Sequence, residues 1–299
     1  MSNNKLRIIL QSMRLPFLLL TPVCVFLGFA TAVSSGAEIN TAVFLLALTG
    51  ALSAHISVNT FNEYLDFRSG LDLVTQKTPF SGGSGALPDN PHAANAVLIV
   101  AITTLVVTTL IGLYFIYLRG LAIFPLGLLG IAIILLYTGW INRHPFLCLL
   151  APGLGFGPLM VTGTHFALTG HYSWQAFIVS LVPLFLVSNL LLLNQYPDID
   201  ADKSVGRRHF PIAFGTGISN WIYAGFISLS YLIILLAVAT GLLPKLSLIS
   251  LLTIMAAVPT LIGVFKYAEN VPKLVPYLGL NVAATLLTPT LLWVSLLVG

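Results

Sequence analysis

The most regular feature of the chain is a succession of long apolar stretches separated by short polar or Gly- and Pro-containing breaks. A helix needs about 20 mostly apolar residues to cross a bilayer. Nine stretches meet this requirement, and the short breaks between neighbours favour antiparallel hairpins. We therefore predict an all-α integral membrane protein with nine transmembrane helices, at 15–33, 39–62, 93–118, 121–140, 146–168, 174–194, 218–243, 246–267 and 275–298.

Composition supports this class of protein. Of the 299 residues 57% are hydrophobic and 7% are charged, whereas a soluble domain carries about 25% charged residues. The mean hydropathy of +0.97 also excludes a disordered chain. Cys24 and Cys148 lie in apolar stretches and are expected to be buried thiols rather than a disulfide framework or zinc site. The segment up to Gln11 lacks a signal-peptide cleavage site, so we expect the first span to be retained.

The Lys and Arg residues orient the predicted helices, because basic residues are enriched in cytoplasmic loops. If the N-terminus is cytoplasmic, only Arg119 and Lys245 of the 13 basic residues fall on the outer side. The sequence thus predicts a multi-pass protein with a cytoplasmic N-terminus. The net charge of +4 follows from this bias, and no basic patch with interleaved aromatic residues indicates a nucleic-acid surface.

Acidic residues gather on the predicted cytoplasmic side. The enrichment of basic residues in cytoplasmic loops does not require this, because acidic residues contribute little to orientation. Of the nine acidic residues, only Glu38 falls on the outer side. Most of the others lie in the two longest loops, after the second and sixth spans, and long connections are usually functional. They are Glu63, Asp66, Asp72 and Asp89 in the first loop, and Asp198, Asp200 and Asp202 in the second.

The two loops contain similar motifs, Asn62-Glu63-Tyr64-Leu65-Asp66 and Asn194-Gln195-Tyr196-Pro197-Asp198. Each follows directly on an apolar span. Such a repeat is expected if two halves of a bundle present matching groups to one cavity.

Helical spacing groups the polar side chains of each motif, because positions four apart share a face. Asn62 shares a face with Asp66, and Asn59 lies close to it. In the second motif Asn194, Asp198 and Asp202 share a face over two turns, and Asp200 points elsewhere. Pro197 is expected to kink the end of the sixth span.

The residue types predict a site for a metal and a diphosphate. Carboxylates are hard oxygen ligands, and Mg²⁺ takes one or two of them together with phosphate oxygens and water. A carboxylate just beyond a span is often only a solvated cap of the helix. Two matched motifs with basic neighbours favour a functional site instead. The basic neighbours are Arg68 and Lys77 at the first motif, and Lys203, Arg207 and Arg208 at the second.

At these residues the chain resembles the UbiA superfamily of intramembrane aromatic prenyltransferases, which has nine helices and aspartate-rich motifs after the second and sixth. The resemblance covers essentially the whole chain, as one domain over 1–299. Glu63 stands where the family usually has Asp, His209 where a Thr is common, and Ser81 where an Arg often follows the motif. Asn59, the spacing from Asp66 to Asp72 and the stretch 157–164 resemble the 1,4-dihydroxy-2-naphthoate branch of menaquinone synthesis.

The resemblance implies Mg²⁺-dependent transfer of a polyprenyl group from its diphosphate to an aromatic acceptor, in the bacterial inner membrane. The acceptor is 1,4-dihydroxy-2-naphthoate or a related quinone precursor; 4-hydroxybenzoate, homogentisate or a lipid-type acceptor remain alternatives. Asp66, Asp198, Asp202 and Lys77 would be catalytic. The implied Mg²⁺ ligands are Asn62, Asp66, Asp72, Asp198 and Asp202, the implied diphosphate-binding residues are Lys77, Lys203, Arg207 and Arg208, and the supporting residues are Asn59, Glu63, Asn194, Tyr64 and Tyr196.

Several other polar or aromatic residues have two interpretations. Tyr64 and Tyr196 either stabilise an allylic cation or are ordinary interface tyrosines, the second being favoured. His55 and Asn189, within spans, either bind the acceptor or join helices by hydrogen bonds. The stretch 81–85 lacks the Gly-Lys-Ser/Thr ending of a P-loop and is expected to form part of a lid over the site.

A cation-coupled transporter is the main non-enzymatic alternative, because it too would show repeated halves, broken helices and carboxylates. Its ion site should lie near the middle of the bilayer, however, and these acids are predicted to lie at one face. Their basic neighbours also suit a phosphate better than a bare cation.

Overall fold

The computed structural model describes residues 2–75 and 77–299, and the described residues form helices without strands. Two short helical segments, α1 and η1, precede α2, the helix of the first span. The elements of the first half are α1 (Ser2–Ser12), η1 (Leu15–Leu19), α2 (Leu20–Ser34), α3 (Thr41–Ser69), α4 (Leu71–Val74), α5 (Ala86–Asp89), η2 (Pro91–Ala93), α6 (Ala94–Arg119), η3 (Leu121–Ile123) and α7 (Phe124–Leu136). Those of the second half are η4 (Ile141–Arg143), α8 (Pro145–Leu154), η5 (Gly155–Thr162), α9 (Gly163–Thr169), α10 (Trp174–Asn194), α11 (Ile199–Ser204), α12 (Phe210–Ala239), η6 (Lys245–Thr253), α13 (Ile254–Tyr267) and α14 (Val271–Val298).

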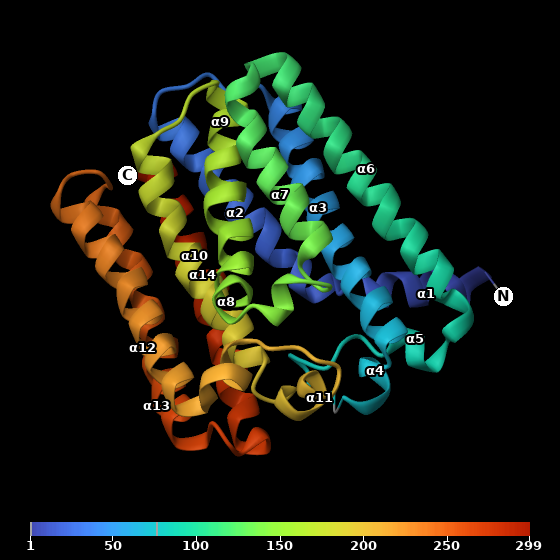
Figure 1. Cartoon of the computed structure of the whole chain (residues 1–299). Helices are drawn as coiled ribbons and strands as arrows, with labels where there is room; N and C mark the ends of the chain where they lie inside the picture. The colour runs from blue at the N-terminus through green and yellow to red at the C-terminus, as the bar shows by residue number, and fades with distance from the viewer. Residues whose placement is uncertain (1, 76) are drawn as a thin grey trace.

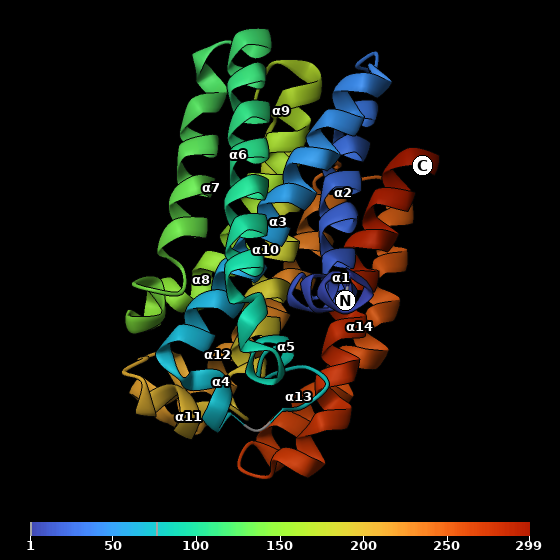
Figure 2. The same ribbon diagram turned by 90° about the vertical axis from the view of Figure 1, so that its right-hand side faces the viewer.

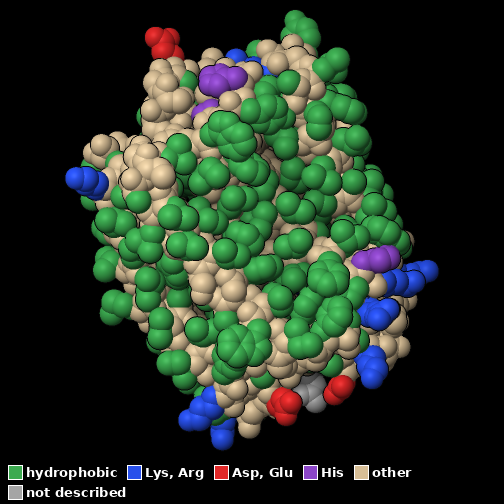
Figure 3. Space-filling model, turned by 60° about the vertical axis from the view of Figure 1, so that its left-hand side comes forward, with side chains coloured by type: hydrophobic (Ala, Val, Ile, Leu, Met, Phe, Trp, Pro, Cys, Tyr) green, Lys and Arg blue, Asp and Glu red, His purple; other side chains and the backbone are tan. Residues whose placement is uncertain are grey.

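The long helices run side by side, and α1 lies crosswise to them (Figures 1 and 2). The short helices α4, α5 and α11 gather at one end of the bundle, which we call the polar end. A space-filling view shows hydrophobic side chains over most of one face, with Lys and Arg mainly near the lower end (Figure 3). This distribution is that of a membrane protein, whose apolar surface faces lipid.

In the described residues, eight helical segments are long and apolar enough to cross a membrane. They match eight of the nine predicted spans. The predicted span 121–140 forms a shorter apolar helix, Leu121–Leu136, which extends about 24 Å at 1.5 Å per residue. The crossing of a ninth helix therefore stays a prediction.

The two largest differences between predicted and observed span boundaries have local causes. The second span continues to Ser69 and ends at Gly70, whose φ of +80° a glycine adopts without strain. The first acidic motif is consequently helical. The seventh span begins at Phe210 rather than 218 because a first helical turn is joined to it across Gly215, where the backbone is not helical.

Close packing of the fifth and sixth spans depends on small residues. A Cβ at Gly153 or Gly157 would collide with the backbone oxygen of Leu184 or Ser180 on α10. Gly157 lies in η5, a π-helical stretch that also contains Pro158. A π-helix accommodates a residue that cannot donate an amide hydrogen. Cys24 and Cys148 are free and buried among apolar side chains, as expected.

Candidate active site

A cavity of about 570 Å³ enters the bundle from the polar end. Its lining is charged and amidic at that end and mostly apolar along the rest of its length, where His55, Thr108, Thr109 and Thr164 are the exceptions. All the charged groups thus lie at one end of the cavity, which is unlike an ion site at the middle of a membrane. The charged and amidic residues of the lining are Arg14, Asn59, Asn62, Asp66, Asp72, Asn142, Asn194, Gln195, Asp198, Asp202 and Arg207.

The first motif meets the cavity from one face of α3. Asn59, Asn62 and Asp66 all line it, as their spacing predicted. The Asn59 amide donates a hydrogen bond to the backbone oxygen of Met13, and the Asn62 amide donates to Thr138 Oγ1 at 3.2 Å. Helix α3 therefore holds these side chains in fixed places by contacts with neighbouring segments.

The second motif is built differently, and the predicted continuous helical face is wrong. Helix α10 ends at Asn194, and α11 begins only at Ile199. Pro197 lacks an amide hydrogen and its ring crowds the preceding turn, which favours the end of the helix here. Asn194, Asp198 and Asp202 nevertheless all line the cavity, while Asp200 is exposed.

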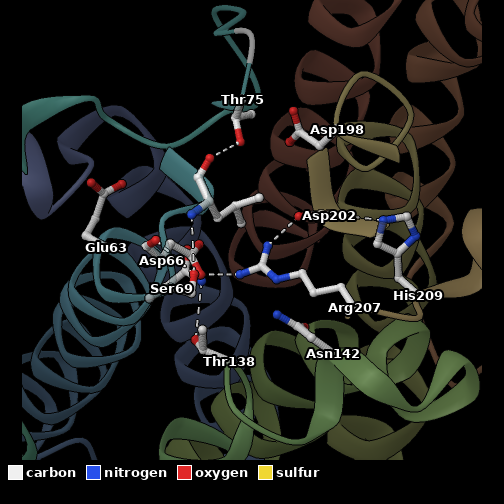
Figure 4. Close-up of polar contacts among 12 residues, drawn as sticks. Glu63, Asp66, Ser69, Thr75, Thr138, Asn142, Asp198, Asp202, Arg207 and His209 are labelled. Carbon is white, nitrogen blue, oxygen red and sulfur yellow. Dashed lines mark hydrogen bonds and ion pairs between the residues drawn. The ribbon is translucent and has the colours of Figure 1, made fainter. Parts of the chain in front are cut away.

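Arg207 joins the two motifs (Figure 4). Its guanidinium forms an ion pair with Asp66 of the first motif and donates from Nη1 to Asp202 Oδ1 at 2.8 Å. Asp202 also pairs with His209 Nε2 at 3.0 Å. Burial acts to lower the pKa of Arg207, but the carboxylates of Asp66 and Asp202 outweigh it and raise this pKa above its ordinary value.

Three buried oxygens at the polar end have no hydrogen-bond donor among the residues that the structure describes: Asp72 Oδ2, Asn194 Oδ1 and Asp198 Oδ1. Burial, together with neighbouring carboxylates, raises the pKa of Asp72 and that of Asp198 to about 7. Arg207 acts to lower both pKa values, but it does not outweigh burial. Hard oxygen donors in this state suit Mg²⁺, which takes its remaining ligands from phosphate and water.

The carboxylates do not converge on a single point. Among residues 2–75 and 77–299, no group of three or more His, Cys, Asp and Glu side chains is placed to hold a metal ion. Between Asp66 and Asp202 lies the Arg207 guanidinium instead. Any metal here would need further ligands from a bound substrate.

Glu63 does not line the cavity, contrary to its expected role as a supporting ligand. Its side chain is fully buried, and it accepts hydrogen bonds from Arg14 Nε at 2.8 Å and from the amide and hydroxyl of Ser84 at 2.7 Å. Glu63 therefore anchors the loop that follows the first motif. The longer Glu side chain, where the family usually has Asp, serves this contact.

The loop around 81–85 forms hydrogen bonds with both motifs, and its role as a lid stays a prediction. Ser84 bonds to Glu63, and the Gly82 amide donates to Asp198 Oδ2 at 3.2 Å. A Cβ at Gly83 would lie 2.9 Å from Asp72 Oδ1, and φ there is +70°. Glycine is thus required where the loop passes over the carboxylate.

Of the four predicted diphosphate-binding residues, only Arg207 lines the cavity. Lys77, Lys203 and Arg208 are exposed, and the Lys77 side chain lies against Gly85. None of these three side chains lines the cavity beside the oxygens of the motifs.

Arg14 is a cavity residue that the sequence analysis missed. It contacts Glu63 and donates to Asn62 Oδ1 at 3.2 Å, and the Glu63 carboxylate raises its pKa against the effect of burial. Its φ of +55° is unusual for a residue other than glycine, and such strain is typical of functional sites. The only signal in the sequence was its place as the last basic residue before the first span.

The structure shows which of the residues with two interpretations line the cavity and which only join helices. Tyr64 packs against the apolar cluster of α1 and α5, and Tyr196 is buried with its hydroxyl donating to Asn220; neither lines the cavity. Asn189 joins helices by donating to the backbone oxygen of Tyr223. His55 bonds to Thr21 at 2.8 Å and does line the cavity.

Comparison with known proteins agrees with this architecture. The model of the UbiA prenyltransferase family matches residues 21–275, which include both motifs. The chain belongs to this family. The resemblance inferred from the motifs is thereby confirmed.

One relative and two solved structures illustrate the similarity. The chain is 29% identical over 207 residues to a Bacillus subtilis protein named 1,4-dihydroxy-2-naphthoate octaprenyltransferase; the match spans 68% of this chain and 65% of that relative. The fold is similar to that of a UbiA homologue from Aeropyrum pernix K1, with a TM-score of 0.71, 16% identity and coverage of 91% of this chain and 95% of that one. A UbiA homologue from Archaeoglobus fulgidus bound to DMAPP and Mg²⁺ gives a TM-score of 0.65 at 13% identity, covering 95% and 98%.

Proposed function

We propose that this protein is a membrane prenyltransferase that moves a polyprenyl group from its diphosphate to an aromatic acceptor. One observation carries the proposal: acidic motifs from two distant segments, together with Arg207, line one end of a cavity that is mostly apolar elsewhere. A diphosphate fits the charged end and an isoprenoid chain fits the apolar length. Membership of the UbiA prenyltransferase family supports this assignment.

The metal of the reaction is Mg²⁺, which the solved structure of the Archaeoglobus fulgidus homologue contains beside DMAPP. Asp72, Asn194 and Asp198 would hold it through their free oxygens, with Asp66 and Asp202 close by. When bound, the metal neutralises charge on the diphosphate and so stabilises the leaving group.

The protein's own groups complete the reaction. Arg207 offers its guanidinium to phosphate oxygens, a pairing that arginine makes with good geometry. The allylic C–O bond then breaks, and the diphosphate leaves with the electron pair. A ring carbon of the acceptor forms the new C–C bond and loses its proton. The apolar walls keep water away from the allylic cation.

The acceptor we favour is 1,4-dihydroxy-2-naphthoate, which the name of the Bacillus subtilis relative contains. We further propose that the whole chain forms one domain with nine spans in a bacterial inner membrane. In this arrangement Leu121–Leu136 is the fourth span, and the polar end faces the cytoplasm. The number of basic residues predicted on that side supports the orientation.

A direct assay tests the function. Purified protein supplied with geranyl, farnesyl or a longer prenyl diphosphate and dihydroxynaphthoate should release diphosphate and form the prenylated ring only when Mg²⁺ is present. Hydroxybenzoate and homogentisate, run in parallel, identify the acceptor. Cation flux across vesicles without any release of diphosphate would favour the transporter and overturn the proposal.

A further inference from the structure

Two histidines lie together at the end of the bundle opposite the polar end. Helix α9 reaches this end (Figure 1), and its residue His165 is fully buried. The helix ends at Thr169, and Gly170 turns the chain with a φ of +84°. The next residue, His171, places its ring beside that of His165, with the ring centres 5.7 Å apart and the ring planes at 87°.

Hydrogen bonds fix the turn that contains the second histidine. The Thr169 hydroxyl donates to the backbone oxygen of His165 at 2.9 Å and accepts from the backbone amide of His171 at 3.3 Å. Tyr172 then donates from its hydroxyl to the backbone oxygen of Ala122 at 2.7 Å. The backbone of His171 is therefore held in place, whereas its exposed ring can turn about the side-chain bonds.

The contacts of His165 decide which of its ring nitrogens carries a hydrogen. The Thr31 hydroxyl has one hydrogen, which it donates to the backbone oxygen of Gly28 at 2.7 Å. At 3.0 Å from His165 Nδ1 the same hydroxyl must accept, so Nδ1 carries a hydrogen. Burial disfavours a charged ring. The neutral ring consequently has its lone pair on Nε2.

This lone pair has no partner within the protein. His165 Nε2 is buried and makes no hydrogen bond to any residue that the structure describes. A buried polar atom without a partner is rare in folded proteins and needs an explanation. An imidazole lone pair beside a second imidazole suits a transition-metal ion, because histidine is the commonest metal ligand. A histidine that binds a metal usually donates its other ring hydrogen to a neighbouring acceptor, as His165 does to Thr31.

The separation of the two rings agrees with one shared ion. Two imidazoles that bind one zinc ion in tetrahedral geometry, at about 2.1 Å from each nitrogen, have ring centres about 5 Å apart. The observed 5.7 Å is close to this value, so rotation of the exposed ring would complete the pair. In the described part of the chain no group of three or more His, Cys, Asp and Glu side chains could hold a metal, so the remaining ligands would be water.

We propose that His165 Nε2 and a ring nitrogen of His171 form a binding site for one transition-metal ion such as Zn²⁺, separate from the acidic motifs. The class of ion follows from the ligands, because imidazole suits Zn²⁺, Cu²⁺ and Ni²⁺, whereas Mg²⁺ prefers oxygen. The ion would tie the turn after α9 to the core of the bundle, where Thr31 of α2 holds His165. This site goes beyond the proposed prenyl transfer and does not depend on it.

Metal binding by the purified protein tests the site. The protein is prepared without a polyhistidine tag and dialysed against Zn²⁺ in an excess of Mg²⁺, which is added to occupy the carboxylates of the polar end. We expect one Zn²⁺ to be bound per chain. The midpoint of thermal unfolding should rise by several degrees with Zn²⁺, because an ion that binds only the folded state stabilises it. With Cu²⁺ as the probe, electron paramagnetic resonance should show two nitrogen ligands.

Two variants remove the ligands one at a time. They are His171→Ala, which removes the exposed ring, and His165→Asn, whose side-chain amide can still donate to Thr31. Each should weaken Zn²⁺ binding about tenfold or more and abolish the rise in the unfolding midpoint. The matched control is His92→Ala, which removes an exposed histidine of η2 and should bind Zn²⁺ as the wild type does.

No binding of Zn²⁺ by the wild type, or wild-type binding in either ligand variant, would overturn the site. Because His171 is exposed, His171→Ala is expected to fold even if His165→Asn does not. The Cu²⁺ spectrum of the wild type counts the nitrogen ligands without any substitution, and a spectrum with fewer than two would also overturn the pair.

Discussion

Asp66 and Asp198 hold equivalent places in two similar motifs, yet Asp66 lies on a continuous helix and Asp198 follows a helix that has ended. Asp66 is paired with Arg207. Asp198 accepts one hydrogen bond, from the Gly82 amide, and its other oxygen has no donor. The same residue type is therefore held by an ion pair in one motif and keeps an oxygen without a donor in the other.

The residues that precede these two aspartates also differ in their hydrogen-bond and ion-pair partners. Asn62 Oδ1 accepts from Arg14, whereas Asn194 Oδ1 has no donor. Glu63 forms an ion pair with Arg14, whereas Gln195 donates only to the Cys148 thiol at 3.3 Å. At these matched positions the helical motif is held by charged groups, whereas the motif at the helix end leaves one Asn oxygen and one Asp oxygen free. Repetition of a sequence motif does not imply repetition of its bonding.

The largest expected effects come from Asp66→Asn and Asp198→Asn. Each removes a carboxylate from the charged end of the cavity, and we expect kcat/KM for prenyl transfer to fall about 100-fold or more, as when one stabilising group is removed from an active site. Asp66→Asn should also lower the midpoint of thermal unfolding, because Arg207 loses a partner. Asp198→Asn should leave that midpoint nearly unchanged, because burial of this carboxylate raises its pKa and an asparagine oxygen can still accept the hydrogen bond from the Gly82 amide.

Asp200→Asn is the matched control for this pair, since Asp200 is exposed in the same segment as Asp198. Its turnover should equal that of the wild type. Normal turnover in either Asp66→Asn or Asp198→Asn would mean that the two motifs do not act as one site. Equal losses of stability in Asp66→Asn and Asp198→Asn would contradict the inference that only Asp66 is held by a stabilising ion pair.

Arg207→Lys should have the next largest effect. The guanidinium reaches Asp66 and Asp202 together, and a lysine ammonium cannot reproduce this planar fork. We expect kcat/KM to fall about tenfold to 100-fold, in the range seen when a group that positions ligands is lost. Arg68→Lys, at an exposed position on α3, is the control and should not change it. Wild-type kinetics in Arg207→Lys would show that the bridge between the motifs is dispensable.

Much of the fold follows from the sequence because hydropathy depends on local composition. Eight predicted spans coincide with helices, and the shared face of Asn62 and Asp66 needed only the helical repeat. The end of α10 was harder to predict. Pro197 indicated a kink, but whether a helix bends or stops at a proline depends on the contacts available beyond it.

The partners of the site residues could not be predicted in the same way. Glu63 meets Ser84 and Arg14 through the path of a loop and the crosswise entry of the N-terminal segment, neither of which leaves a periodic signal. The sequence of the two motifs also suggested that all the neighbouring Lys and Arg side chains face the site. Lys203 and Arg208 are exposed because only some positions of a short turn can face inward.

Glu63→Gln should produce a moderate loss of stability. It removes the negative charge opposite Arg14 but keeps an oxygen for Ser84, so we expect a loss of about 1–3 kcal/mol, as for a hydrogen bond to a charged group. The midpoint of thermal unfolding in detergent should fall by a few degrees. Gln195→Met, at the equivalent position of the second motif, loses only a weak contact with a thiol and should change the midpoint less. A larger fall in the unfolding midpoint for Gln195→Met than for Glu63→Gln would contradict the inference that the first motif contains the stronger contacts.

The smallest contrast concerns the two tyrosines of the motifs. Tyr196→Phe removes a buried hydrogen bond to Asn220 Oδ1 at 2.7 Å and leaves that oxygen without a donor, which should cost about 1–2 kcal/mol of stability. The Tyr64 ring packs, half-buried, against the cluster of α1 and α5, so Tyr64→Phe should stay within about 0.5 kcal/mol of the wild type. Because neither ring lines the cavity, Tyr64→Leu should also retain prenyl transfer within about twofold. A tenfold loss in that variant, with the protein still folded, would return the ring to a role in stabilising the allylic cation.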